Sequence, residues 1–240
     1  MRPAGVLRVV TWNVRSALEQ GLGALAEVIR ALNADVVALQ EVDRLTLRSG
    51  GKDQTAELAR ECGFAFHQFS AATQWEGGGE YGLALRSRHE LLDLELTQLP
   101  VDGLGAHPSA TEPRILAGAR LACGVTVLNT HFGLTESQRR RQADAVADRC
   151  RAAGPLVLMG DFNATPVDPV LDPIRDVMRD SAAGLAAEER VTFPLPAPGK
   201  AIDYVFVSPE LQVGSVRIAR EATGASDHYP VVVEVVAAVT

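Results

Sequence analysis

The sequence predicts an α/β protein, because short β-like runs alternate with helix-like segments along its 240 residues. Residues 6–14 (VLRVVTWNV) are rich in β-branched and aromatic residues, which favour a strand. Residues 22–32 repeat apolar side chains at the spacing of one helix face. No linker-like stretch interrupts the alternation, so we expect residues 1–240 to form a single domain.

The next elements follow in chain order. The apolar run at 35–43 (DVVALQEVD) indicates a strand buried on both faces, and 54–62 (QTAELAREC) indicates a helix that ends at Gly63. Residues 136–152 predict a helix, and 155–163 (PLVLMGDFN) predict another buried strand. Further strands are expected at 64–70, 81–87, 91–98, 115–122, 125–131, 202–207, 213–219 and 230–236, with a short helix near 168–178. Loops are expected at 74–80, 100–113 and 182–200.

Composition and charge narrow the classes of partner. The formal net charge is −7, and Lys52 and Lys200 are the only lysines, so the sequence lacks the clustered lysine that favours tight duplex binding. The three cysteines lie far apart without a CxxC pair, which is typical of reduced, structural thiols. The sequence shows no signal-peptide core and no transmembrane segment, so we expect a cytoplasmic location.

Several apolar runs end in polar clusters: VVTWNVR, VVALQEVD, TVLNTHFG, LVLMGDFN, IDYVFVS and SDHYPVVV. Burying polar groups without partners costs several kcal/mol, so six such clusters indicate that the strand ends converge on one polar site. The side chains in these clusters are the carboxylates Glu41, Asp161, Asp203 and Asp227, the amides Asn13 and Asn163, and the imidazoles His131 and His228.

This set of side chains suits metal-assisted phosphoryl transfer. Hard oxygen ligands without thiolates favour Mg²⁺ or Mn²⁺ over zinc. The two histidines can donate hydrogen bonds to a phosphoryl oxygen, where charge develops in the reaction. For any single motif, a structural polar network at the base of a loop is the alternative.

The ordered motifs TWN, LQE, NTH, GDFN, IDY and SDH resemble those of the endonuclease/exonuclease/phosphatase superfamily, the group with a DNase I-like fold. The match extends from Asn13 to His228, and GDFN followed by SDHYP is a specific signal. The resemblance implies a four-layer αββα sandwich, in which two mixed β-sheets pack face to face with helices outside. It also implies a phosphoester hydrolase that depends on Mg²⁺ or Mn²⁺ and acts by attack of activated water on phosphorus.

The resemblance implies a role for each matching residue. Glu41 resembles the principal metal ligand, Asn13 helps to place metal and phosphate, and Asp227 resembles a second carboxylate on the metal side. Asp161 resembles the carboxylate that orients or deprotonates the attacking water. Asn163 would hold that water or a phosphate oxygen.

The histidines and one arginine complete the expected site. His228 resembles the histidine that contacts the scissile phosphate, and Asp203 resembles the partner that orients it and favours its protonated form. His131 resembles an additional phosphate-contacting histidine. Arg114, just before a predicted strand, is expected either to reach a substrate phosphate or to form a surface ion pair.

Neighbouring residues are expected to have structural roles. Trp12 and Phe162 alternate with site residues along their strands and should point into the core. Asn129 and Thr130 are expected to make local hydrogen bonds to the backbone. The arginines at 139–141 are expected on a solvated helix face.

The substrate class is inferred from what the sequence lacks. The chain is short and acidic and has no lysine-rich insert, so we expect a small-molecule or lipid-derived phosphoester, hydrolysed by a phosphodiesterase or phosphatase. A DNA or RNA nuclease is the alternative, with a nucleic acid as the partner. A non-catalytic binding module on the same fold is the second alternative, which the intact set of polar residues disfavours. No interface signal is evident, so we expect a monomer, and the Gly-rich segment 74–80 is expected to be a lid or a flexible connection.

Overall fold

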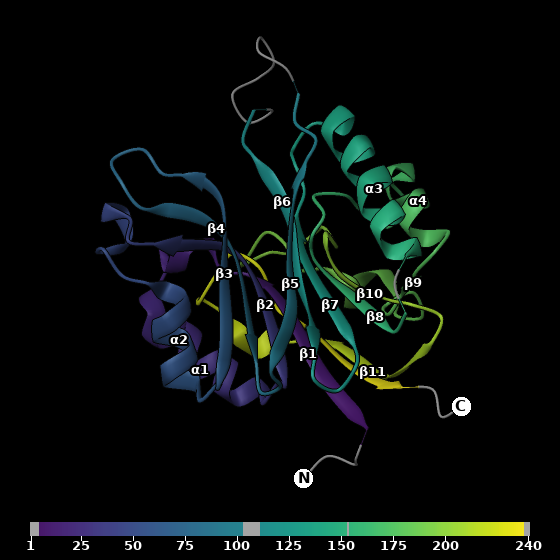
Figure 1. The fold of residues 1–240 in the computed structure, drawn as a ribbon, viewed down its shortest axis with the longest axis horizontal. Coiled ribbons are helices and arrows are strands. Elements are labelled where there is room, and N and C mark those ends of the chain that lie inside the picture. Colours follow the sequence, from purple (N-terminus) through teal and green to yellow (C-terminus); the bar gives the residue numbers. More distant parts are fainter. Residues whose placement is uncertain (1–4, 103–110, 153, 238–240) are drawn as a thin grey trace.

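Two six-stranded β-sheets face each other in the computed structural model, which describes residues 5–102, 111–152 and 154–237 (Figure 1). The strands are β1 (Val6–Asn13), β2 (Val36–Arg44), β3 (Phe66–Gln74), β4 (Glu80–Ser87), β5 (Leu91–Leu99), β6 (Arg114–Leu121), β7 (Thr126–His131), β8 (Leu156–Asp161), β9 (Arg179–Asp180), β10 (Asp203–Val207), β11 (Leu211–Ile218) and β12 (Val231–Ala237). The first sheet has the order β11-β12-β1-β2-β4-β3, and the second has the order β5-β6-β7-β8-β10-β9. Each sheet is mixed, because β1 pairs with β2, and β7 with β8, in parallel.

Helices cover the outer face of each sheet. Helices α1 (Gly21–Leu32) and α2 (Gln54–Cys62) pack on the first sheet, and α3 (Glu136–Arg151) and α4 (Asp172–Arg175) pack on the second (Figure 1). Asp53 caps α2 by accepting a bond from Ala56 N, and Thr135 caps α3 in the same way from Gln138 N. The predicted four-layer αββα sandwich is therefore confirmed.

Alternation along the strands decides which side chains face the space between the sheets. In β1, Val9 joins the apolar cluster between the sheets, whereas Val10 and Trp12 join the cluster under α1 and α2. In β8, Val157 and Met159 face the first sheet, whereas Leu158 faces α3. The same alternation sends the last residues of β1 and β8, Asn13 and Asp161, toward the space between the sheets.

The elements differ from the predicted ones mainly in the last third of the chain. The expected short helix near 168–178 is divided into a 3₁₀ turn (Pro169–Leu171) and the short α4, and β9 begins at Arg179. The expected loop at 182–200 contains one helical turn, α5 (Ala187–Arg190). Of the expected loop at 100–113, residues 103–110 lie outside the described residues. In the described part of the chain, no helix is both long enough and apolar enough to cross a membrane.

The expected core positions are confirmed, but the expected local hydrogen bonds are not. Trp12 and Phe162 are fully buried in the core, as predicted. The expectation of local bonding by Asn129 is wrong, because its Nδ2 donates to the carbonyls of Leu39 (3.0 Å) and Ala84 (3.2 Å) in the opposite sheet. Thr130 also bonds over a long separation, to the carbonyl of Ile115 on the neighbouring strand. Asn129 therefore links the two sheets.

Candidate active site

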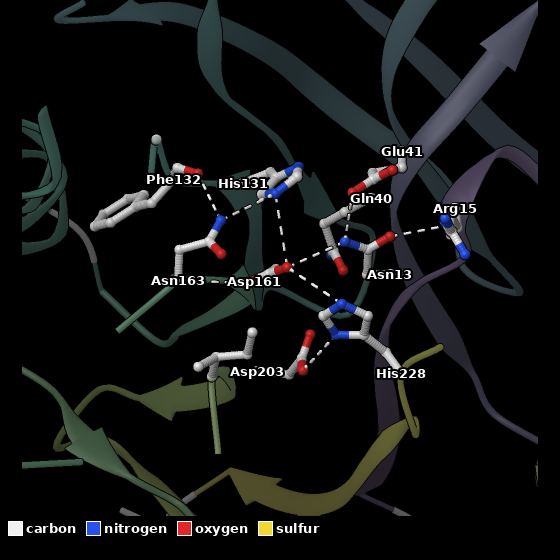
Figure 2. Close-up of polar contacts among 12 residues, drawn as sticks. Asn13, Arg15, Gln40, Glu41, His131, Phe132, Asp161, Asn163, Asp203 and His228 are labelled. Atoms are coloured by element: carbon white, nitrogen blue, oxygen red, sulfur yellow. Dashed lines mark hydrogen bonds and ion pairs between the residues drawn. The ribbon is translucent and has the colours of Figure 1, made fainter. Parts of the chain in front are cut away.

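The ends of the strands meet at a cavity of about 350 Å³ between the sheets. Its walls include eight of the nine residues predicted for the site: Asn13, Glu41, Arg114, His131, Asp161, Asn163, Asp227 and His228. The ninth, Asp203, lies behind His228 (Figure 2). The sequence motifs therefore converge in space, as expected.

Glu41 reaches the cavity because β2 contains a bulge. Simple alternation after Val37 and Leu39, which face α1 and α2, would turn Glu41 toward the helices. The register of β2 against β4 shifts by one residue between Leu39 and Val42, and Glu41 has φ 56°. A bulge re-aims a side chain, and positive φ in a non-glycine residue is strained and typical of functional positions. Local strain thus places the Glu41 carboxylate in the cavity.

Asp161 is the centre of the polar network (Figure 2). Its Oδ2 accepts a bond from Asn13 Nδ2 (3.0 Å) and lies 3.6 Å from His131 Nε2 and 3.8 Å from His228 Nε2. Its Oδ1 accepts a bond from the backbone N–H of Asn163 (2.9 Å). Burial and the charge of Asp203 raise the pKa of Asp161 to about 7, although His228 and the hydrogen bonds oppose this rise.

The amide of Asn13 bridges two carboxylates. Its Nδ2 donates to Glu41 Oε1 (2.9 Å) as well as to Asp161, while its Oδ1 accepts a bond from the backbone N–H of Arg15 (3.1 Å). The amide nitrogen therefore faces the carboxylates, and the oxygen faces the backbone. In this orientation Asn13 fixes the positions of Glu41 and Asp161; direct contact of its oxygen with a cation would require the amide to rotate.

His228 is held on two sides. Its Nδ1 lies 2.9 Å from Asp203 Oδ2, which also accepts a bond from Thr192 Oγ1 (2.6 Å). The ring of Phe193 packs against the imidazole, with 4.5 Å between centroids. Burial lowers the pKa of His228, but the charge and hydrogen bond of Asp203, with Asp161 and Asp227, outweigh it and raise the pKa to about 9. The ring is therefore cationic at neutral pH, and its Nε2–H faces the cavity.

His131 differs from His228 in that its surroundings favour the neutral ring. Arg114 Nη1 lies 3.1 Å from His131 Nδ1 and donates to it, so the proton of the neutral ring is on Nε2. Burial, Arg114 and His228 hold the pKa of His131 well below its usual range. Asn163 Nδ2 lies 3.3 Å from His131 Nε2 and donates to the carbonyl of Phe132 (2.9 Å). Arg114 forms an ion pair with Glu112, with Nη1 3.2 Å from Oε1, but its side chain is only 5% exposed and lines the cavity, so the pair does not lie on the open surface.

The donor set fits a hard divalent cation. Burial raises the pKa of Glu41, as it does that of Asp161, so a cation beside these carboxylates would stabilise their charged forms. Oδ1 of Asp203 is buried and has no hydrogen-bond partner among the described residues. Single ligand atoms of Asp161, Asp203 and His228 lie within 4.8 Å of one another. Carboxylate oxygens held in this way are the ligands that Mg²⁺ and Mn²⁺ prefer.

Eight cavity residues were not predicted from the sequence: Arg15, Arg48, Trp75, Tyr81, Glu112, Leu134, Phe193 and Ile202. Trp75 and Tyr81 flank the Gly-rich turn, where an aromatic residue beside three glycines is the one signal that could have drawn attention to them. Arg15 and Arg48 follow the ends of β1 and β2, close to the predicted motifs, but no distinctive spacing marks them in the sequence. Arg15, Arg48, Trp75 and Tyr81, which lie on or beside strands β1 to β4, form the wall of the cavity on the side of the first sheet.

Solved structures similar to this chain share its fold. An endonuclease/exonuclease/phosphatase protein from Beutenbergia cavernae is 26% identical, with 97% of this chain and 72% of that chain covered and a TM-score of 0.80. The human Nocturnin catalytic domain with bound sulfate is 22% identical, with 96% and 93% covered and a TM-score of 0.74. A mannosyl-6-phosphatase from Bacteroides thetaiotaomicron is 21% identical, with 96% and 99% covered and a TM-score of 0.73. None of the curated proteins compared with the sequence matches it.

The family is identified by the sequence match. Residues 10–228, which include every motif that contributes to the cavity, match the endonuclease/exonuclease/phosphatase family. The chain therefore belongs to the endonuclease/exonuclease/phosphatase family, whose members are hydrolases that act on phosphoesters.

Proposed function

We propose that this protein is a divalent-metal-dependent phosphoester hydrolase in which Asp161 directs the attack of water on phosphorus. The observation that carries the proposal is the position of the Asp161 carboxylate, buried between Asn13, His131 and His228 with one edge at the cavity. A pKa near 7 suits a group that accepts a proton from water at neutral pH. Asn163, bonded to Asp161 through its backbone, orients the water or a phosphate oxygen.

Mg²⁺ or Mn²⁺ would be held on the Glu41 side of the cavity, with Asp227 as a second carboxylate and Asn13 positioning Glu41. A cation bound there supplies positive charge that neutralises the phosphoryl oxygens. We place His228 outside the ligand set, although it belongs to the cluster with Asp161 and Asp203. Its Nδ1 is held by Asp203 Oδ2 at 2.9 Å, and the surrounding carboxylates favour the protonated ring, which has no free lone pair.

The remaining polar residues stabilise charge on the phosphoryl group. The Nε2–H of cationic His228 donates to a phosphoryl oxygen as negative charge develops there, and Asp203 keeps the ring oriented and protonated. Neutral His131 donates through Nε2, because Arg114 occupies its Nδ1. Arg114 also brings a buried positive charge to the wall of the cavity, where it attracts the anionic substrate.

A small-molecule or lipid-derived phosphoester is the proposed substrate. The cavity of about 350 Å³ lies within the range of small-ligand sites, and the protein carries a formal net charge of −7. A protein of the same fold from Bacteroides thetaiotaomicron is a mannosyl-6-phosphatase. We assign this chain a phosphatase or phosphodiesterase activity of the same general kind.

A DNA or RNA nuclease is the alternative, and one observation favours it. Arg15, Arg48 and Arg114 all line the cavity and could contact successive phosphates. A nuclease that contacts several phosphates loses affinity steeply as salt concentration rises, whereas a small-substrate enzyme changes little. Duplex or single-strand affinity measured across a salt series separates the two functions.

The experiment that tests the proposed function is hydrolysis of p-nitrophenyl phosphate and bis(p-nitrophenyl) phosphate with Mg²⁺, with Mn²⁺ and with EDTA. Release of p-nitrophenol with either metal, abolished by EDTA, is the expected result. The preferred ester assigns a phosphatase or a phosphodiesterase. Equal rates with metal and with EDTA would contradict metal dependence.

A further inference from the structure

Arg48 is fixed in place by a buried carboxylate. It lies in the 3₁₀ turn Leu47–Ser49 that follows β2, and its Nε and Nη2 donate to the two oxygens of Asp43, each at 2.7 Å. Asp43 is fully buried and also accepts bonds from Ser16 Oγ (3.1 Å) and Thr46 Oγ1 (2.7 Å). A guanidinium bound by two parallel hydrogen bonds has a fixed direction. Asp43 therefore acts as an anchor on one edge of Arg48.

Two aromatic rings pack on the same guanidinium. Arg48 Cζ lies 3.5 Å from the centroid of the Trp75 ring and 5.4 Å from that of Tyr81. Trp75 is at the start of the Gly-rich turn between β3 and β4, and its backbone N–H donates to Gly79 O (2.9 Å). Gly79 has φ +80°, and a Cβ there would lie 2.5 Å from the backbone of Leu45. This close approach brings the turn, and with it Trp75, against the segment that carries Arg48.

The third nitrogen of Arg48 is available at the cavity. Its Nε and Nη2 are bonded to Asp43 and Ser16, whereas Nη1 has no acceptor among residues 5–102, 111–152 and 154–237. The side chain is 28% exposed and lines the same cavity as Glu41 and Asp161. Arg15, with a side chain 50% exposed, lines the cavity too. The wall thus presents a fixed, charged donor beside the reaction centre.

We propose that Arg48, stacked on Trp75, binds a second anionic group of the substrate, a carboxylate or a phosphate on the part that does not react. This inference rests on the proposed function and narrows its substrate class to small phosphoesters with two anionic groups. The two free N–H groups of Nη1 can donate to the oxygens of such a group. Because Asp43 is fully buried on the opposite edge, it fixes Arg48 without contacting the ligand.

Binding of phosphonates tests the inference without any need for turnover. The probes are alkylphosphonates and matched ω-carboxyalkylphosphonates, such as propylphosphonate and 3-phosphonopropionate, in a short series of chain lengths. Dissociation constants are measured by calorimetry in the presence of Mg²⁺. At the best chain length the carboxylate should improve affinity about tenfold or more, as expected of a charge-assisted hydrogen bond.

The variants distinguish binding by the Arg48 guanidinium from a general effect of positive charge near the cavity. Arg48→Lys keeps a cation that can pair with Asp43 but has no further nitrogen to reach the cavity, so the tenfold preference should fall to nearly none. Trp75→Leu should reduce the preference by removing the stacked ring. Arg44→Lys is the matched control, because Arg44 pairs with Glu80 and stacks on Phe69 but does not line the cavity. It should keep the full preference.

Three results would overturn the inference. The first is equal binding of the two members of every pair, or no binding of either. The second is a preference that persists in Arg48→Lys. The third is Arg48-dependent binding of oligothymidylate without any preference among the phosphonates, which would assign Arg48 to a nucleic acid. The outcome is different if the wild type prefers the carboxylated phosphonates, loses this preference in Arg48→Lys, and hydrolyses no ester. That result would support the subsite and refute only the proposed function.

Discussion

The Nδ1 atom of His228 lies 2.9 Å from Oδ2 of Asp203, and both side chains are buried at the base of the cavity. The other ring nitrogen faces Asp161 Oδ2 at 3.8 Å. Burial alone would make the ring neutral, but the neighbouring carboxylates raise the pKa of His228 to about 9. The pair thus provides a cationic donor at the cavity, where we propose that a phosphoryl oxygen binds.

Replacing Asp203 with Asn should lower the pKa of His228. The variant removes the negative charge beside Nδ1, so burial becomes the dominant influence on the ring. In protein treated with EDTA, the His228 Hε1 resonance should titrate near pH 9 in the wild type and about one unit or more lower in Asp203→Asn. The exposed Asp172→Asn variant is the control, and an unchanged His228 titration in Asp203→Asn would refute the charge pairing.

The same pair should make stability depend on pH. The folded pKa of His228, about 9, lies above the unfolded value of 6.5, so its contribution is fully present below pH 6.5 and is lost as pH rises through 9. Urea unfolding in EDTA should therefore show that the stability of the wild type falls relative to His228→Gln across this window. Parallel curves for the two proteins would show that the ring is not protonated preferentially in the folded state.

Replacing His228 with Ala should lower kcat by about 10²–10³, the usual cost of losing one donor to the transition-state oxyanion. KM for the same ester should change much less, because the donor acts mainly as charge develops. His67→Ala is the matched control, since His67 is exposed on β3 far from the cavity walls. Nearly full turnover by His228→Ala would remove this residue from the mechanism.

Replacing Glu41 with Gln should weaken metal binding while leaving the fold intact. The Mg²⁺ concentration for half-maximal turnover should rise about tenfold or more, because the carboxylate charge is lost while the size of the side chain is kept. Glu57→Gln, at a surface ion pair with Lys52, serves as the control. An unchanged Mg²⁺ dependence in Glu41→Gln would contradict its assignment as a ligand.

Replacing Asn129 with Ala should destabilise the protein without touching the cavity. The change removes the Asn129 donor to the carbonyls of Leu39 and Ala84 between the sheets. It also removes one acceptor of Gln40 Nε2, which keeps its bond to Thr11 Oγ1 (3.0 Å). The free energy of unfolding should fall by about 2–4 kcal/mol, as is typical of buried polar groups left unpaired. The exposed Gln98→Ala variant should change it little, and an equally small effect in Asn129→Ala would show that water replaces the lost bonds.

The sequence predicted the fold and most of the cavity because both depend on regular patterns. Apolar runs of strand length gave the two sheets, and alternation correctly placed Trp12 and Phe162 in the core. The polar strand ends gave seven of the residues that line the cavity, and Arg114 was predicted separately. In each case a local pattern is sufficient for the prediction, because the residues at the end of a strand lie at one edge of the sheet.

The features that the local sequence does not determine depend on contacts between distant segments. Alternation would turn Glu41 away from the cavity, and only the bulge opposite β4 explains its actual direction. Arg48 meets Trp75 because the turn at Gly79 packs on Leu45, which no periodicity indicates. Asn129 bonds across the sheets for the same reason. Such pairings are determined by packing of the whole fold and not by the local sequence.

The most direct test of the account is turnover of the better p-nitrophenyl ester by Asp161→Asn at saturating Mg²⁺. The variant keeps a hydrogen-bonding side chain of the same shape but cannot accept a proton from water. We predict a loss of about 10²–10⁴ in kcat with the fold unchanged, and no such loss in the exposed Asp172→Asn control. Wild-type turnover by Asp161→Asn would contradict the assignment of Asp161 as the group that directs water onto phosphorus.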